Sequence, residues 1–184
     1  MFFEKSVICP ITVGRANDLQ ILDGLILLAT EWRGQIALIS GESGIGKTRF
    51  AKEAETRASQ HGLVLRGSCF QTESAQPYAP LIDLFRYYLS THSEDEIKQN
   101  LNPYAASFVR LMPELGVYFP GVAPVPTPDP KIEKQRTFQS LTHALTDFAK
   151  RTPLVVIIED LHWSDTASLE FLSLLAQRIA PLSI

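Results

Sequence analysis

One segment of eight residues, Gly41-Glu-Ser-Gly-Ile-Gly-Lys-Thr48, constrains the fold of this chain more than any other feature. It follows the apolar run of residues 35–40 and precedes a stretch of helical patterning from about Lys47 to His61. It fits the pattern G-x-x-x-x-G-K-[ST], in which glycines let the backbone turn so tightly that successive N–H groups face an anion. The positive N-terminal end of the following helix adds to this effect. The segment therefore predicts a phosphate-holding loop between a strand and a helix.

Two side chains of this loop have distinct expected roles. Lys47 can reach β- and γ-phosphate oxygens as a mobile point charge. The Thr48 hydroxyl can ligate a Mg²⁺ ion that bridges the same phosphates. We expect the rest of the loop and the arginine after it to surround the bound phosphates. These residues are Gly41, Glu42, Ser43, Gly44, Ile45, Gly46 and Arg49.

The residues around the loop predict a strand–helix–strand unit. Residues 35–40 (QIALIS) form a short apolar run of strand length, and a second strand is expected from Leu63 to about Cys69. Gly62 stands where a glycine commonly ends a helix. Residues 35–69 thus predict a βαβ unit, which implies a parallel sheet and a right-handed crossover.

A pair of acidic residues follows the most apolar run of the chain. Residues 154–158 (LVVII) are apolar on both faces, as in a central strand of a parallel sheet, and Glu159 and Asp160 follow directly. Carboxylates at the carboxyl edge of such a sheet face the crevice where ligands bind. We expect Glu159 to hold Mg²⁺ and Asp160 to polarise the attacking water of a hydrolysis reaction. The reverse assignment stays open because aspartate is the more usual Mg²⁺ partner, and one acid could instead cap the next turn or pair with a lysine.

Periodic apolar residues predict helices over most of the remaining chain. The expected helices span residues 16–31, 80–89, 103–112, 131–150 and 166–180, with a capping box at Ser93 and Glu96 opening a further short helix and Asp165 capping the last one. Closely spaced prolines in residues 116–130 predict an extended surface connection. We expect one partial domain over residues 1–184, with a lead-in at 1–14, a helical and proline-rich insert at about 70–130, and a truncated C-terminal end.

Composition narrows the class of protein. Hydrophobic residues make up 45% of the chain and charged residues 20%, which supports a packed core and argues against intrinsic disorder. The net charge of −3 gives the chain no overall attraction to nucleic acid or anionic lipid. No apolar run approaches the ~18–20 residues that span a bilayer, and the N-terminus lacks the apolar region of a signal peptide. Cys9 and Cys69 lack metal-ligand spacing, and we expect both to be reduced thiols in a cytoplasmic protein.

Five segments together resemble a known family. They are Val13-Gly-Arg-Ala16, ISGESGIGKTRF, RGSCF, QPYAPL and VVIIEDLHWSD. The chain resembles the AAA-type ATPase domain of the STAND class of signal-transduction NTPases, which is found in large LuxR-type regulators and in cyclase- or kinase-linked regulators. The resemblance implies a three-layer αβα P-loop NTPase fold, ATP as the nucleotide with its adenine near Gly14 and Arg15, and a contact of Arg15 with the base or phosphates. It also implies a role as a nucleotide-driven switch.

The resemblance has departures and leaves three functional hypotheses. Position 159 is Glu where such families often carry Asp, and the helical, winged-helix and output regions expected as partners in the same chain are missing. We expect an ATP-binding, Mg²⁺-dependent and ATP-hydrolysing regulatory domain with possible self-association. One alternative is a nucleotide-gated interaction module without useful turnover. The other is a DNA-associated ATPase of the origin-recognition or RecA-like kind, against which the acidic charge balance weighs.

Overall fold

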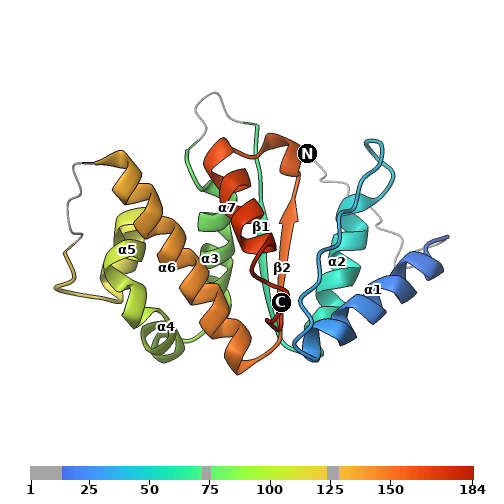
Figure 1. Ribbon diagram of the computed structural model, residues 1–184, viewed down its shortest axis with the longest axis horizontal. Coiled ribbons are helices and arrows are strands. Elements are labelled where there is room, and N and C mark those ends of the chain that lie inside the picture. Colours follow the sequence, from blue (N-terminus) through green and yellow to red (C-terminus); the bar gives the residue numbers. More distant parts are fainter. Residues whose placement is uncertain (1–13, 72–75, 124–128) are drawn as a thin grey trace, which may run out of the picture.

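The computed structural model describes residues 14–71, 76–123 and 129–184 and shows helices around a small parallel sheet (Figure 1). The helices are α1 (Ala16–Thr30), α2 (Lys47–Ala58), α3 (Ala79–Thr91), α4 (Glu94–Leu101), α5 (Ala105–Leu111), α6 (Pro130–Arg151) and α7 (Thr166–Ala176). Three short 3₁₀ segments are η1 (Asn102–Tyr104), η2 (Pro113–Val117) and η3 (Leu161–Trp163). The strands are β1 (Leu63–Ser68) and β2 (Leu154–Glu159). The mixture of helices and a parallel sheet confirms the expected α/β class.

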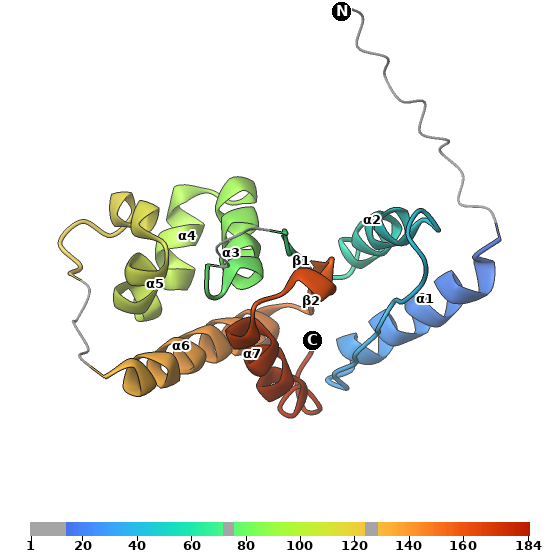
Figure 2. The ribbon, with the colours of Figure 1, turned by 90° about the horizontal axis from the view of Figure 1, so that it is seen from above.

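The two strands lie side by side in parallel, although α3 to α6 separate them in the sequence. Their register runs from Leu63 opposite Leu154 to Ser68 opposite Glu159. One more bond extends the ladder at the carboxyl end, where the Cys69 N–H donates to the Glu159 carbonyl at 3.0 Å. Figure 2 shows α1 and α2 on one side of this sheet and the group α3 to α6 on the other. The sheet therefore separates the segment that carries the phosphate-loop motif from the helical insert.

The expected first strand of the βαβ unit is wrong as a sheet strand. Residues 35–40 run extended towards the loop, but in the described part of the chain they pair with neither β1 nor β2. Instead, residues 183 and 184 lie beside the start of the extended run and the start of β2. The Gln35 N–H donates to the Ile184 carbonyl at 2.9 Å, and the Leu154 N–H donates to the Ser183 carbonyl at 2.8 Å. A β-strand needs hydrogen bonds to a neighbouring strand along its length. Residues 183 and 184 bond to the run of residues 35–40 only at Gln35, so the run does not form a strand.

The main core lies under the helical insert. Its fully buried rings include Phe85, Tyr88, Phe108 and Phe171, and Phe85 meets Phe108 edge-on at 4.5 Å between ring centres. Helix α3 packs directly on the backbone of β1, because a Cβ at Gly67 would overlap the Pro80 carbonyl. Packed aromatic pairs of this kind stabilise a core beyond the apolar area that they bury. The insert is therefore firmly attached to the sheet.

Most of the expected helices are confirmed, with shifts at their ends. Helix α2 ends at Ala58 and α7 at Ala176, both earlier than expected, while residues 103–112 divide into part of η1 and α5. The capping box is present: the Ser93 N–H donates to Glu96 Oε2 at 2.9 Å. The lead-in up to residue 13, which includes Cys9, and residues 124–128 of the proline-rich connection lie outside the described residues.

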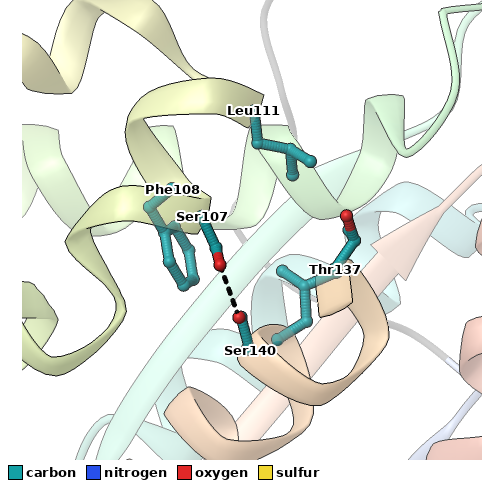
Figure 3. A pocket seen from close by; sticks show the side chains of 6 residues that line it. Ser107, Phe108, Leu111, Thr137 and Ser140 are labelled. Carbon is teal, nitrogen blue, oxygen red and sulfur yellow. Dashed lines mark hydrogen bonds between the residues drawn. The ribbon is translucent and has the colours of Figure 1, made fainter. Parts of the chain in front are cut away.

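A very small cavity lies between α5 and α6 (Figure 3). Its volume is about 10 Å³, and the hydroxyl groups of Ser107 and Ser140 bond to each other beside it at 2.8 Å. Such a volume holds about one water molecule. The cavity is therefore a packing space rather than a ligand site.

Candidate functional site

The loop of residues 41–46 leads directly into α2. Gly44 and Gly46 have φ angles of 81° and 93°, and Gly46 is the N-cap of the helix. Side-chain-bearing residues rarely adopt these left-handed angles, so the path of the loop depends on glycine at both positions. The loop lies largely exposed at the N-terminal end of α2. Backbone N–H groups at such an end favour an anion.

The Lys47 ammonium is held over the loop by the loop's own carbonyls. Its Nζ donates to the carbonyl oxygens of Gly41 and Glu42, at 2.9 Å each. Phosphate oxygens carry negative charge, so they attract the ammonium more strongly than neutral carbonyl oxygens do. Thr48 follows in an exposed position and Arg49 in a half-buried one. The loop and the first turn of α2 thus carry the residues from Gly41 to Arg49 that the sequence predicts as phosphate contacts, and the contacts themselves stay a prediction.

Arg15 lies against the same loop. Its Nη2 donates to the Ile45 carbonyl at 2.8 Å, and its guanidinium sits 5.7 Å from the centre of the Phe50 ring in α2. These two contacts connect the start of α1 to the tip of the loop and to the helix behind it. The structure therefore places Arg15 beside the loop, and its contact with a base or phosphate stays a prediction.

At the end of β2, the Glu159 carboxylate takes part in a half-buried ion-pair network. The Arg66 guanidinium on β1 binds both Glu159 and, at 3.1 Å, Oε2 of Glu55 on α2. The Tyr87 hydroxyl donates to the other Glu55 oxygen at 2.8 Å. Burial opposes the charge on Arg66, but its ion pairs outweigh this and raise the pKa of the guanidinium. The Glu159 side chain is only 10% exposed, and the Arg66 guanidinium fixes its position.

Sequence reasoning missed Arg66. The signal available was a charged residue at an alternate position of the apolar strand LVLRGS, where a half-buried arginine needs an acidic partner. Its partner Glu159 is 93 residues away in the sequence, and their contact depends on the register of β1 against β2. From the sequence, one of the two acids could form an ion pair with a lysine. In the structure Glu159 forms an ion pair, but its partner is an arginine.

The next acid, Asp160, has a different environment. Its backbone is left-handed, with φ 55° and ψ 40°, and the residue is exposed where the chain turns into η3. Asp165 acts as the N-cap of α7, as expected: it accepts hydrogen bonds from the Ser168 N–H at 2.9 Å and from the Ser168 hydroxyl at 2.6 Å. It also accepts from the Tyr78 N–H at 3.2 Å. Of Glu159, Asp160 and Asp165, Asp160 is therefore the most open to solvent.

The phosphate loop and the acidic strand end lie at the same end of the molecule. Figure 1 shows the tip of β2 and the loop before α2 both at the top of the view. Within the described ranges, no group of three or more His, Cys, Asp or Glu side chains is gathered as a ready metal site. Oxygens of a phosphate ligand and water would therefore have to complete the coordination of any ion bound there.

No helix in the described residues combines the length and apolar character needed to cross a membrane. No solved structure gives a significant match to the chain. A search of curated proteins finds similarity to an uncharacterized protein of Rhizobium meliloti (strain 1021), 26% identical over 190 residues. The match covers 94% of this chain but only 18% of that protein. The model of the AAA ATPase domain family matches residues 12–184. The phosphate loop and the extent of this match together show that the chain belongs to the AAA ATPase domain family.

Proposed function

We propose that the chain binds ATP at residues 41–48 with Mg²⁺ and hydrolyses it as a regulatory switch. The observation that carries this proposal is the position of the Lys47 ammonium, 2.9 Å from two carbonyls of a glycine-rich loop at the start of a helix. The loop carbonyls hold the cation where phosphate oxygens would replace them. Family membership supports nucleotide binding and makes hydrolysis possible.

The residues around the loop have complementary roles in this proposal. Amide groups and Lys47 hold the phosphates, while the Thr48 hydroxyl and a carboxylate after β2 are the hard oxygen donors that suit Mg²⁺. When bound, Mg²⁺ would neutralise part of the negative charge of the phosphates. Arg15, through its bond to the Ile45 carbonyl, keeps the loop tip near the start of α1, where we place the adenine.

The contacts of Glu159 and Asp160 favour the reverse of the roles first expected, in which Glu159 holds Mg²⁺ and Asp160 polarises the water. Glu159 is fixed by Arg66, whereas Asp160 is exposed. We therefore assign Asp160 to the Mg²⁺ side of the site. Glu159 is assigned to the attacking water, with Arg66 as a positioning residue that sets its direction.

Several broader features belong to the same proposal. We propose a three-layer αβα P-loop domain over residues 1–184, with the helical insert at about 70–130 as its variable part. The curated relative is far longer than the matched region, which supports a domain that works inside a larger regulator. Exchange between ATP and ADP would then bias a two-state equilibrium in that larger protein, as in STAND-class switches. We place the protein in the cytoplasm.

Calorimetry on single-site variants tests the proposal. Lys47→Ala should weaken Mg-ATP binding by at least about tenfold, because it removes a charge-assisted contact worth roughly 1.5–3 kcal/mol. Lys52→Ala, an exposed lysine further along α2, is the matched control and should bind normally. Asp160→Asn and Glu159→Gln should keep binding and slow phosphate release. Normal binding by a folded Lys47→Ala protein would overturn the site.

One observation favours a second candidate, a nucleotide-gated interaction module without turnover. The carboxylate of Glu159 is paired with Arg66, which competes with a water molecule for its oxygens. If the wild-type protein binds Mg-ATP but releases no phosphate, the module is the correct function. If Arg66→Gln then gains hydrolysis, the ion pair is the restraint.

A further inference from the structure

A second recess lies on the other side of β1 from the phosphate loop. It has a volume of about 240 Å³ and opens where the chain leaves β1 and β2, beside the first turns of α3. Figure 1 shows α3 and α2 on opposite sides of the two strands, so the α3 side of this recess lies away from the phosphate loop. The residues used in the argument are Cys69, Phe70, Asp83, Arg86, Trp163 and Asp165.

Two large aromatic side chains border this recess and remain exposed. Phe70 follows β1 and is 64% exposed, and Trp163 follows β2 and is 43% exposed. Aromatic residues left in water on a concave surface are enriched at sites of molecular recognition. Cys69 also lines the recess and is buried, and burial raises the pKa of its thiol, which therefore stays neutral. The walls thus offer flat, apolar contact area.

The charged groups of the recess favour a cation. Asp83 accepts the Ser68 N–H at 2.9 Å, which uses only part of the acceptor capacity of a carboxylate, about four hydrogen bonds. Asp165 adds a second negative charge, although its oxygens serve the cap of α7. Arg86, the one basic residue among the described residues of the lining, donates from Nε to Glu114 at 2.8 Å and is balanced by it. The local balance is therefore acidic.

We propose that this recess binds a guanidinium group, which packs against Phe70 and Trp163 and pairs with Asp83. The guanidinium ion is planar, weakly hydrated and able to stack on aromatic faces while donating to a carboxylate. An ammonium ion is more strongly hydrated, and an anion would meet two carboxylates. The volume is below the ~300–1,000 Å³ of sites for drug-sized ligands, which fits an arginine side chain or a small guanidino compound.

Fluorescence of Trp163 gives a direct readout. The chain has two tryptophans, and Trp32 lies exposed just after α1, so Trp32→Phe leaves Trp163 as the only reporter. This protein is titrated with N-acetyl-arginine amide, with an arginine-containing octapeptide, and with the citrulline analogue of each as the neutral control. We expect saturable binding of the arginine compounds, at least tenfold tighter than their citrulline analogues. A peptide much tighter than the amide identifies a protein partner, and equal affinities identify a small compound.

Variants in the same background test the assigned contacts. Asp83→Asn keeps an oxygen for the Ser68 N–H but loses the charge, and should weaken arginine binding at least tenfold. Asp95→Asn, an exposed acid in α4 that does not line the recess, should have no effect. Phe70→Ala, at an exposed position that leaves the core intact, should weaken binding several-fold. Equal affinity for citrulline, an unchanged Asp83→Asn protein, or no saturation by about 10 mM ligand would overturn the proposal.

Discussion

The two sides of the sheet are built very differently. On the insert side, α3 to α7 share one core cluster in which residues such as Leu84 and Phe108 are fully buried. Among the described residues of the phosphate-loop side, 14–58, the contiguous buried cluster is limited to Ile26 and Ala58, together with Val64 of β1, and Phe50 and Ala54 of α2 are buried outside it. The same side leaves Leu38 80% exposed. The apolar driving force for folding is therefore concentrated on one side of the molecule.

The contrast shows how the molecule separates stability from ligand binding. Segments with few buried apolar contacts open locally at low free energy, and ligand-binding elements are commonly drawn from them. A phosphate ligand on residues 41–48 would supply contacts that this side lacks, so binding should order it more than the insert. The insert and the two strands should keep the same structure when the phosphate-loop side becomes ordered.

The largest effect that this comparison predicts comes from a pair of leucine truncations. Leu84→Ala opens a cavity where α3 packs on Gly67, and should lower the free energy of unfolding by about 2–5 kcal/mol. Leu38→Ala removes the same atoms from an exposed position and should change it by less than about 0.5 kcal/mol. Urea denaturation followed by circular dichroism measures both. Similar losses in the two variants would mean that residues 35–40 are buried in solution.

A second prediction concerns the small cluster under α1 and α2. Ile26→Ala should lower the local opening free energy of α2 amides by about 2 kcal/mol, because it removes one of three buried members of that cluster. Amides of α3 should be unaffected. Hydrogen exchange followed by mass spectrometry distinguishes the two regions. Equal loss of protection in α2 and α3 would show that the two sides unfold as one unit.

The sequence predicts local features well because their causes are local. Apolar periodicity locates the helices, and the capping box at Ser93 and the cap at Asp165 follow from short side-chain-to-backbone bonds. The phosphate loop is recognised from glycine spacing. Contacts that depend on register are not recognisable in this way: the pairing of Arg66 with Glu159 needs β1 and β2 aligned. Whether residues 35–40 pair as a strand likewise depends on which backbone lies beside them.

A third prediction tests the connection between α1 and the phosphate loop. Arg15→Ala removes the hydrogen bond to the Ile45 carbonyl and the contact with Phe50, and should weaken Mg-ATP binding by about two- to tenfold, as expected for 0.5–1.5 kcal/mol. Calorimetry gives the affinity, and hydrogen exchange at Ile45 and Gly46 without nucleotide shows whether the loop loses order. Arg33→Ala, an exposed arginine after α1, is the control. Unchanged affinity and exchange in Arg15→Ala would show that the contact has no role in the loop.

The smallest predicted effect is a pH dependence confined to the insert side of the sheet. The Tyr104 hydroxyl donates to Asp147, and this bond lowers the pKa of the carboxyl below its ordinary 3.8, while burial and Asp147 raise the pKa of Tyr104 to about 12. Because the folded state holds the Asp147 proton less tightly than the unfolded state, the stabilisation is complete above about pH 4 and is lost as pH falls through the lower pKa. The phenol shows the opposite sign, with stability lost as pH rises from about 10 to 12.

Tyr104→Phe removes the phenol titration and the largest cause of the lowered Asp147 pKa. It should cost about 0.5 kcal/mol of stability at pH 7, a value reduced for solvent screening because the Asp147 side chain is 39% exposed. The difference from the wild type should shrink below pH 3 and again above pH 11, in urea titrations repeated across pH. Lys150→Met, which removes the other partner of Asp147, keeps the phenol and should retain the alkaline loss. A constant difference at every pH would mean that Tyr104 contributes through packing alone, and nucleotide affinity should stay unchanged throughout because the pair lies on the insert side.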